Sequence, residues 1–138
     1  KATPSDCCGV TFHANAGAYI GGASYPTSGR FAFDVRDQAV GAAVQAGANL
    51  VDSDIWVRAA RITRVASSQV AGNALQLWGA ARNVRVRWLA AQDLAGRGIE
   101  TDGLTGGSGI VVDYARTDRA RLSPEYGVSA AVTYRDVG

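Results

Sequence analysis

Apolar and polar residues alternate in short runs along much of this chain. In RFAFDVRD (residues 30–37) and NVRVRWLA (residues 83–90), apolar positions recur every second residue and most positions between them are charged. A period of two places the two sets of side chains on opposite faces of a strand. We therefore expect half-buried β-strands in both segments, and similar runs between Asn49 and Val137 predict several more.

One segment departs from this alternation. In DQAVGAAVQA (residues 37–46), Val40 and Val44 are four positions apart, which places them on one face of a helix. Asp37 can cap the start of a helix, and Gly47 can end one in a left-handed turn. We therefore expect one short helix near 37–46.

The strand-like runs recur at similar intervals. Ile99 follows Leu75 by the same interval as Gly103 follows Gly79. The interval from Val84 to Ile110 is only slightly longer. Intervals of this size are typical of proteins that stack one structural repeat on the next.

The order of strand, polar turn, Gly-Ile or Asn-Ala-Leu, and second strand resembles that of right-handed parallel β-helices. The families concerned are the pectate-lyase-like proteins and the tailspikes of bacteriophages, and the resemblance covers about 49–137. It implies a mainly β fold, a short parallel β-helix or solenoid with the one short helix near 37–46. The alternative is an antiparallel β-sandwich or barrel, because closely spaced short strands give similar intervals. In both cases residues 1–9 form a polar N-terminal tail and residues 10–138 a single β-rich domain.

Composition narrows the range of functions. The 138 residues are 47% hydrophobic and 19% charged, which is typical of one globular domain. No apolar run is long enough to span a bilayer, and the net charge of +2 comes without a basic stripe interleaved with aromatic residues. We therefore expect no membrane span, no nucleic-acid partner and no cofactor. Because methionine is absent, we expect a chain that starts after a processing event, such as removal of a secretory signal, or one excised from a longer protein.

Two pairs of acidic residues stand two positions apart: Glu100 and Asp102 in GIETDG, and Asp52 and Asp54 in VDSDI. Strand residues two apart share a face and lie roughly 6.6 Å from each other. At that separation one carboxylic acid can protonate a glycosidic oxygen while the other carboxylate activates water. The same residues on an exposed strand are also compatible with plain solvation. These four are the candidate catalytic residues, and clustered acids in a groove are also what the β-helix resemblance implies for an enzyme.

Arginines form a second group of candidates. If Val84 and Val86 face inward, Arg85 and Arg87 face outward together, and Arg64 lies on a nearby strand-like run. A guanidinium binds carboxylates and phosphates through two parallel hydrogen bonds. The alternative is that charge on an outer face only keeps the sheet soluble.

Tryptophans form the third group. Trp56 lies between two apolar residues, so alternation turns it outward, where an indole can stack on a sugar. Trp88 falls on the face of Val84 and Val86, and we expect it in the core. Arg85, Arg87, Arg64 and Trp56 are therefore the candidate ligand-binding residues.

The two cysteines, Cys7 and Cys8, are adjacent and cannot close a long loop within the chain. Inert thiols, a disulfide between neighbours and a contact between chains all remain open, and the last makes both residues candidates for an intermolecular contact. With His13 as the single histidine, we expect no metal site.

Three functions fit these observations. We favour an extracellular or phage-type module that binds a polysaccharide, a cell-surface glycan or another receptor, is secreted or lies on a virion surface, and forms a homo-oligomer. The first alternative is a self-assembling subunit of a filament or spike, in which an open sheet edge pairs with a neighbour. The second is a polysaccharide hydrolase or lyase, and we favour a binding role over an enzyme.

Overall fold

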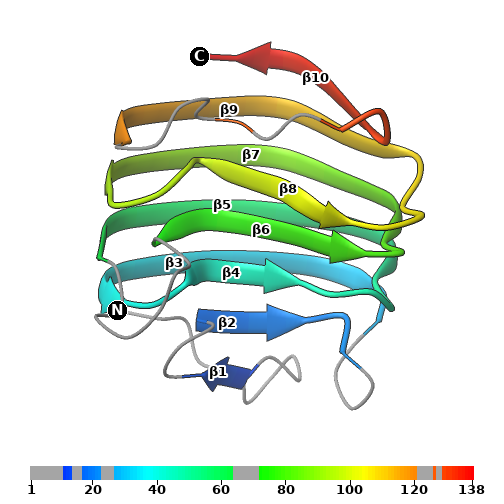
Figure 1. The fold of residues 1–138 in the computed structure, drawn as a ribbon, viewed down its shortest axis with the longest axis horizontal. Coiled ribbons are helices and arrows are strands. Elements are labelled where there is room, and N and C mark those ends of the chain that lie inside the picture. The colour runs from blue at the N-terminus through cyan, green and yellow to red at the C-terminus, as the bar shows by residue number, and fades with distance from the viewer. Residues whose placement is uncertain (1–10, 14–16, 23–26, 64–71, 121–125, 127–128) are drawn as a thin grey trace.

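The computed structural model describes residues 11–13, 17–22, 27–63, 72–120, 126 and 129–138. The strands of these residues form two sheets that lie face to face (Figure 1). Sheet A contains, in spatial order, β1 (Thr11–His13), β2 (Gly17–Ile20), β4 (Ala42–Ala46), β6 (Asn73–Gly79) and β8 (Ile99–Leu104). Sheet B contains β3 (Gly29–Ala39), β5 (Val51–Thr63), β7 (Arg82–Leu94), β9 (Ile110–Ala120) and β10 (Val132–Val137).

From β4 to β9 the chain alternates between the two sheets, so that each strand pairs with the strand two places away in the sequence. Within the described part of the chain, β1 and β2 pair antiparallel and the other paired strands run parallel. Successive pairs, one strand from each sheet, stack as layers from the β3 end to the β10 end (Figure 1).

The predicted fold class is wrong. The described residues contain no helix, and their parallel strands form two separate sheets, rather than the β-helix or solenoid with one helix that we expected. The segment 37–46 instead contains the end of β3 and all of β4. Asp37 adopts a left-handed backbone with φ of 55°, which redirects the chain where a helix would begin. The antiparallel alternative fails as well, because the ladders that build both sheets are parallel.

The intervals in the sequence nevertheless align neighbouring strands. Leu75 of β6 lies opposite Ile99 of β8, as their interval predicts. Gly79 lies opposite Leu104 rather than Gly103, because the pairing shifts by one residue after Gln76. A repeat interval therefore locates partner strands, whereas an inserted residue changes their register.

The core lies between the two sheets and consists of columns of similar side chains. In sheet A, Val44, Leu75 and Ile99 occupy equivalent buried positions on three neighbouring strands. Ile55 and Val86 do the same in sheet B. Burial of one such side chain contributes about 1.5–3 kcal/mol, so the stacked columns supply most of the driving force for folding.

A column of left-handed residues bends the strands of sheet B. Asp37, Arg61, Asp93 and Arg119 occupy equivalent positions in β3, β5, β7 and β9, with φ between 54° and 57°. In β5 the residues of the hydrophobic core, Ile55, Val57 and Ala59, follow an interval of two, and the next core residue, Ile62, comes after an interval of three. Each left-handed residue is thus one extra residue in its strand. It turns the chain so that the next apolar side chain again points into the core.

A left-handed conformation costs a non-glycine residue about 1–2 kcal/mol, and ion pairs along the column offset part of that cost. Arg61 Nη2 lies 2.7 Å from Asp37 Oδ2, and Arg119 Nη2 lies 3.0 Å from Asp93 Oδ2. The column alternates negative, positive, negative and positive, so each residue faces an opposite charge on the next strand.

Two glycines with positive φ test how tightly the layers are packed. A Cβ at Gly79 (φ 69°) would lie 2.4 Å from Ala48 Cβ, whereas a Cβ at Gly106 (φ 93°) would meet nothing within 4 Å. We expect Gly79→Ala to lower the free energy of unfolding by about 2–5 kcal/mol, because backbone strain and steric overlap add. Gly106→Ala, the matched control, should cost about 1–2 kcal/mol. Urea denaturation of both variants measures the difference, and equal losses would contradict the packing at Gly79.

Candidate functional site

The outer face of sheet B, defined here as the side of β3, β5, β7, β9 and β10 away from sheet A, carries most of the candidate residues that the structure describes. An extra residue in β7 shapes it. Ile55 lies opposite Val86, but the next residue, Trp56, lies opposite Trp88. Arg87 is therefore left over in β7 as the extra residue of a β-bulge.

This bulge explains one wrong prediction. Val86 and Leu89 are both buried, so the two residues between them, Arg87 and Trp88, both face outward. Strict alternation from Val84 would have placed Trp88 in the core. Because Arg87 is an extra residue, Trp88 lies on the opposite, outward face of β7. Trp88 is 38% exposed.

The next strand repeats the arrangement. In β9, Val112 and Ala115 are buried, with Asp113 and Tyr114 outward between them. Both outward residues follow their β7 counterparts, Arg87 and Trp88, by the interval that separates Val84 from Ile110. Neither was among the predicted site residues, although that interval contained the signal that could have identified them.

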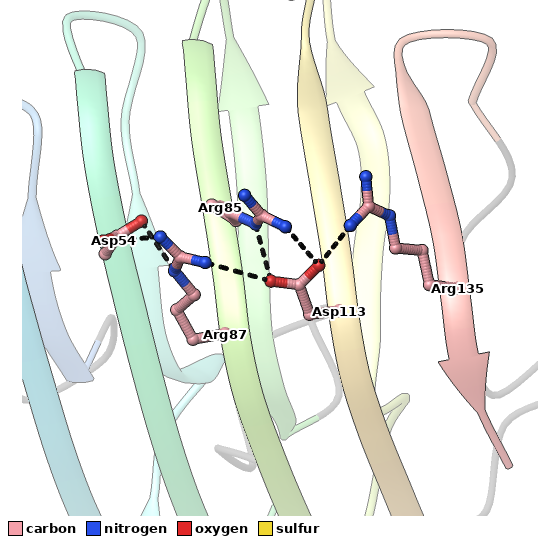
Figure 2. Close-up of polar contacts among 5 residues, drawn as sticks. All are labelled: Asp54, Arg85, Arg87, Asp113 and Arg135. Carbon is pink, nitrogen blue, oxygen red and sulfur yellow. Dashed lines mark hydrogen bonds and ion pairs between the residues drawn. The ribbon is translucent and has the colours of Figure 1, made fainter.

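Arg85 and Arg87 face outward together, as alternation predicts, and both belong to an ion-pair network (Figure 2). Arg85 Nε donates to Asp113 Oδ2 over 2.6 Å, and Arg87 Nε donates to Asp54 Oδ1 over 3.1 Å. Arg87 Nη1 also lies 3.6 Å from Asp113 Oδ2, and Arg135 Nη1 donates to Asp113 Oδ1 over 3.2 Å. Three guanidiniums thus share two carboxylates, which leaves this network with a net positive charge.

The hydrogen bond from Arg85 holds the pKa of Asp113 below its ordinary value, and the charges of Arg85, Arg135 and Arg87 act in the same direction against the effect of burial. Asp113 is therefore ionised at neutral pH and joins three strands, β7, β9 and β10. The predicted arginines are positioned by carboxylates that the pattern in the sequence did not single out as their partners.

An aromatic row, made of Trp56, Trp88 and Tyr114, crosses β5, β7 and β9 beside the network. Trp56 faces outward as predicted and is half-buried. Trp88 and Tyr114 have nearly parallel rings, with centroids 6.4 Å apart and an interplanar angle of 4°. The guanidinium carbon of Arg116 lies 4.6 Å from the Tyr114 ring centroid, a cation–π contact that extends the row. Over two strand spacings the row spans roughly 10 Å.

Asp52 and Asp54 both point away from the core, because Ser53 between them is buried, but they bind different partners. Asp52 has a left-handed backbone with φ of 48°. Its Oδ1 accepts a hydrogen bond of 2.6 Å from Asn83 Nδ2, whereas Asp54 binds Arg87. Both line one shallow groove of about 450 Å³, but each carboxylate is held by a different partner.

Glu100 and Asp102 both point away from the core, on the outer face of sheet A, and are thus far from the aromatic row. Thr101 between them is buried. Arg97 Nη1 donates to Glu100 Oε1 over 3.1 Å and to Asp102 Oδ2 over 2.8 Å. The pair lies together as predicted, with one guanidinium between the two carboxylates.

The two carboxyl groups have pKa values displaced in opposite directions. Burial raises the pKa of Glu100, and the neighbouring Asp102 carboxylate raises it further. Hydrogen bonds from Arg97 and from the Glu100 carboxyl lower the pKa of Asp102. A displacement of this kind separates a potential proton donor from a carboxylate that stays ionised.

The remaining predicted residues lie outside the described part of the chain: Cys7, Cys8 and Arg64, together with the tail of residues 1–9. Within the described ranges, no group of three or more His, Cys, Asp or Glu side chains could hold a metal ion. The same ranges contain no helix of the length and hydrophobicity that crossing a membrane requires.

Neither a family model, nor a curated protein, nor a solved structure matches this chain. The resemblance to pectate-lyase-like proteins and tailspikes stays a prediction from the sequence, and function is inferred from the geometry of the site.

Replacing Asp113 by Asn tests the ion-pair network. The variant leaves three guanidiniums facing one another without their shared carboxylate, and we expect the melting temperature at pH 7 to fall by a few degrees. Because the folded-state pKa of Asp113 is lowered, its stabilising effect is present above the unfolded-state pKa of about 3.9 and is lost as the pH falls through the folded value. The difference from wild type should therefore shrink steadily as the pH falls below about 3.9.

Asp118→Asn is the matched control. Among the ion pairs of the described residues, Asp118 has the exposed Arg119 as its partner, and Arg119 keeps Asp93 when Asp118 is replaced. A melting temperature for Asp113→Asn that matches that of the control at pH 7 would contradict the role of Asp113.

The acid pair on sheet A predicts pH dependences of opposite sign. The raised folded-state pKa of Glu100 means that wild type loses stability as the pH rises through that pKa, and Glu100→Gln escapes this loss. Relative to wild type, Glu100→Gln should gain stability between pH 4 and pH 7. Asp102→Asn should lose relative stability as the pH rises from 2 to 5, because the pKa of Asp102 is lowered. Urea denaturation across this pH range measures both trends, and parallel profiles would contradict the assignment.

Proposed function

We propose that this chain is a glycan-binding β-structural module whose ligand lies along the aromatic row on the outer face of sheet B. The observation that carries the proposal is the pair of parallel rings, Trp88 and Tyr114, with Trp88 38% exposed. An exposed indole in a folded protein costs hydration free energy unless a ligand covers it, and the apolar face of a sugar ring packs flat against such a surface.

Polar groups flank the row on both sides, as a sugar with many hydroxyl groups requires. The ion-pair network lies on one side, and its guanidiniums and carboxylates supply donors and acceptors in fixed positions. Arg58 and Arg116 lie on the other side, each two positions along the strand from Trp56 and Tyr114. A row of rings between polar rows matches the alternating apolar and hydroxyl surfaces of a saccharide.

The outer face of sheet B also carries more positive than negative charge. Outside the left-handed column, whose two aspartates and two arginines balance, it includes seven arginines and five aspartates: Arg30, Arg36, Arg58, Arg85, Arg87, Arg116, Arg135, Asp34, Asp54, Asp113, Asp118 and Asp136. The excess favours a ligand or receptor with acidic groups over a cationic one.

A secreted or virion-surface location and a homo-oligomer are parts of the same proposal. Support for oligomerisation comes from β10, which is the last strand of sheet B and has β9 as its one partner strand among the described residues. An edge of this kind can pair with another chain. Light scattering of the purified protein gives its native mass, and a monomer at micromolar concentration would rule out this part.

Trp88→Ala tests the binding surface. On a glycan array that includes neutral and acidic polysaccharides, we expect wild type to bind a restricted set and Trp88→Ala to lose at least about tenfold in affinity, or about 1.4 kcal/mol. Isothermal titration with the best glycan measures the loss.

Trp78→Ala is the matched control, because Trp78 lies on sheet A and contacts Tyr19 with centroids 6.3 Å apart. Melting temperatures establish that both variants are folded. A loss of binding in Trp78→Ala but not in Trp88→Ala would contradict the proposed surface, and so would an array without any bound glycan.

Glycoside hydrolysis at Glu100 and Asp102 is the second candidate. The opposite displacement of the two pKa values favours it, since a carboxyl with a raised pKa beside a carboxylate with a lowered pKa suits general acid catalysis. Release of reducing ends from the glycans that the array identifies, abolished in Glu100→Gln, would support it. Binding without any product would leave the module a binding protein.

A further inference from the structure

A groove of about 420 Å³ crosses the outer face of sheet B on the side of the aromatic row away from the ion-pair network. Its walls include Arg36, Arg58, Arg61 and Arg116. Its floor includes Ala60, opposite Arg36 of the neighbouring strand, and Ala90, opposite Arg58. The small floor residues leave the space between the guanidiniums open.

The four guanidiniums differ in their partners. Arg36 Nε lies 2.7 Å from Asp34 Oδ1, Arg61 binds Asp37, and Arg116 Nη2 lies 2.6 Å from Asp136 Oδ1. Among the ion pairs of the described residues, none involves Arg58, and its side chain is exposed. Arg58 is thus a cation in a concave site where the neighbouring guanidiniums are already neutralised.

One carboxylate also lines the groove. Asp118 of β9 belongs to its wall, and this carboxylate is paired with Arg119. Its charge is therefore offset by a partner outside the groove lining. Arg58 makes no direct ion pair among the described residues, and Asp34, which lies opposite it on β3 and is bound to Arg36, attracts it only at longer range. Of the four guanidiniums that line the groove, Arg58 is therefore the one without a directly bound carboxylate among the described residues.

The groove continues into the aromatic row. Trp56 and Arg58 are two positions apart on β5, so their side chains leave the same face roughly 6.6 Å from each other. Arg116 lies over the Tyr114 ring at the other side of the groove. A saccharide on the row would therefore extend a substituent toward Arg58 without leaving the sheet.

We propose that this groove is a subsite for the acid group of an anionic glycan, a carboxylate or a sulfate, with Arg58 as its principal partner. The inference rests on the proposed glycan-binding function and adds the chemical class of the ligand. The guanidinium of Arg58 presents two parallel N–H donors to two oxygens of the acid group, whereas Arg36, Arg61 and Arg116 are held by their own carboxylates.

Three polymers with one backbone provide the test: uncharged dextran, carboxymethyl dextran and dextran sulfate. We expect wild type to bind at least one charged polymer more tightly than dextran at physiological ionic strength. Arg58→Gln should weaken that binding about tenfold and leave dextran unchanged. Arg58→Lys should show an intermediate loss, because the charge stays and the two parallel donors do not. Preference between the two charged polymers distinguishes carboxylate from sulfate.

Arg82→Gln is the matched control, since Arg82 is also exposed and lies outside the groove. Equal weakening by Arg58→Gln and Arg82→Gln would overturn the subsite and indicate nonspecific attraction. A charged polymer that binds no more tightly than dextran would overturn it as well. Loss of glycan binding in Trp88→Ala is read on the array independently, so the subsite can fail while the proposed function holds.

Discussion

Parallel stacking imposes one constraint on this protein, because equivalent residues of neighbouring strands lie only about 4.8 Å apart. In the core the constraint is favourable: Val44, Leu75 and Ile99 stack as similar apolar side chains. On the surface it would bring like charges together, which destabilises neighbouring strands. The structure meets the constraint by alternation, as in the column of Asp37, Arg61, Asp93 and Arg119. Charge order along each column therefore also specifies which strands are neighbours.

The functional face follows from the same geometry. A single extra residue, Arg87, turns Trp88 outward, and the equivalent arrangement in β9 turns Tyr114 outward beside it. Since the strands are in register, the two rings stack into one continuous row. The charged residues on either side are aligned by the same pairing, which explains how a flat sheet presents apolar and polar rows side by side. Binding on such a face depends on register as much as on residue type.

Period-two alternation correctly predicted several strands and the outward positions of Arg85, Arg87 and Trp56, and the repeat interval placed Leu75 opposite Ile99. Alternation failed wherever an extra residue enters a strand. The left-handed Asp37 accounts for the false helix, and the bulge at Arg87 accounts for the wrong placement of Trp88. The positions of these extra residues cannot be predicted from the pattern of apolar and polar residues, because an aspartate or arginine does not indicate a left-handed conformation as a glycine does. The carboxylates that hold Arg85 and Arg87 lie on neighbouring strands, a whole layer away along the chain, so local sequence could not identify them.

The left-handed column has a consequence for how a chain of this kind can grow. Its charges alternate from one layer to the next, negative at Asp37 and Asp93 and positive at Arg61 and Arg119. Duplication of a single layer would set two carboxylates or two guanidiniums against each other at the corner, whereas duplication of two adjacent layers would preserve every contact. Opposite charges therefore stay next to each other in the column only if layers are added in pairs, so the column favours lengthening of the protein by two layers at a time.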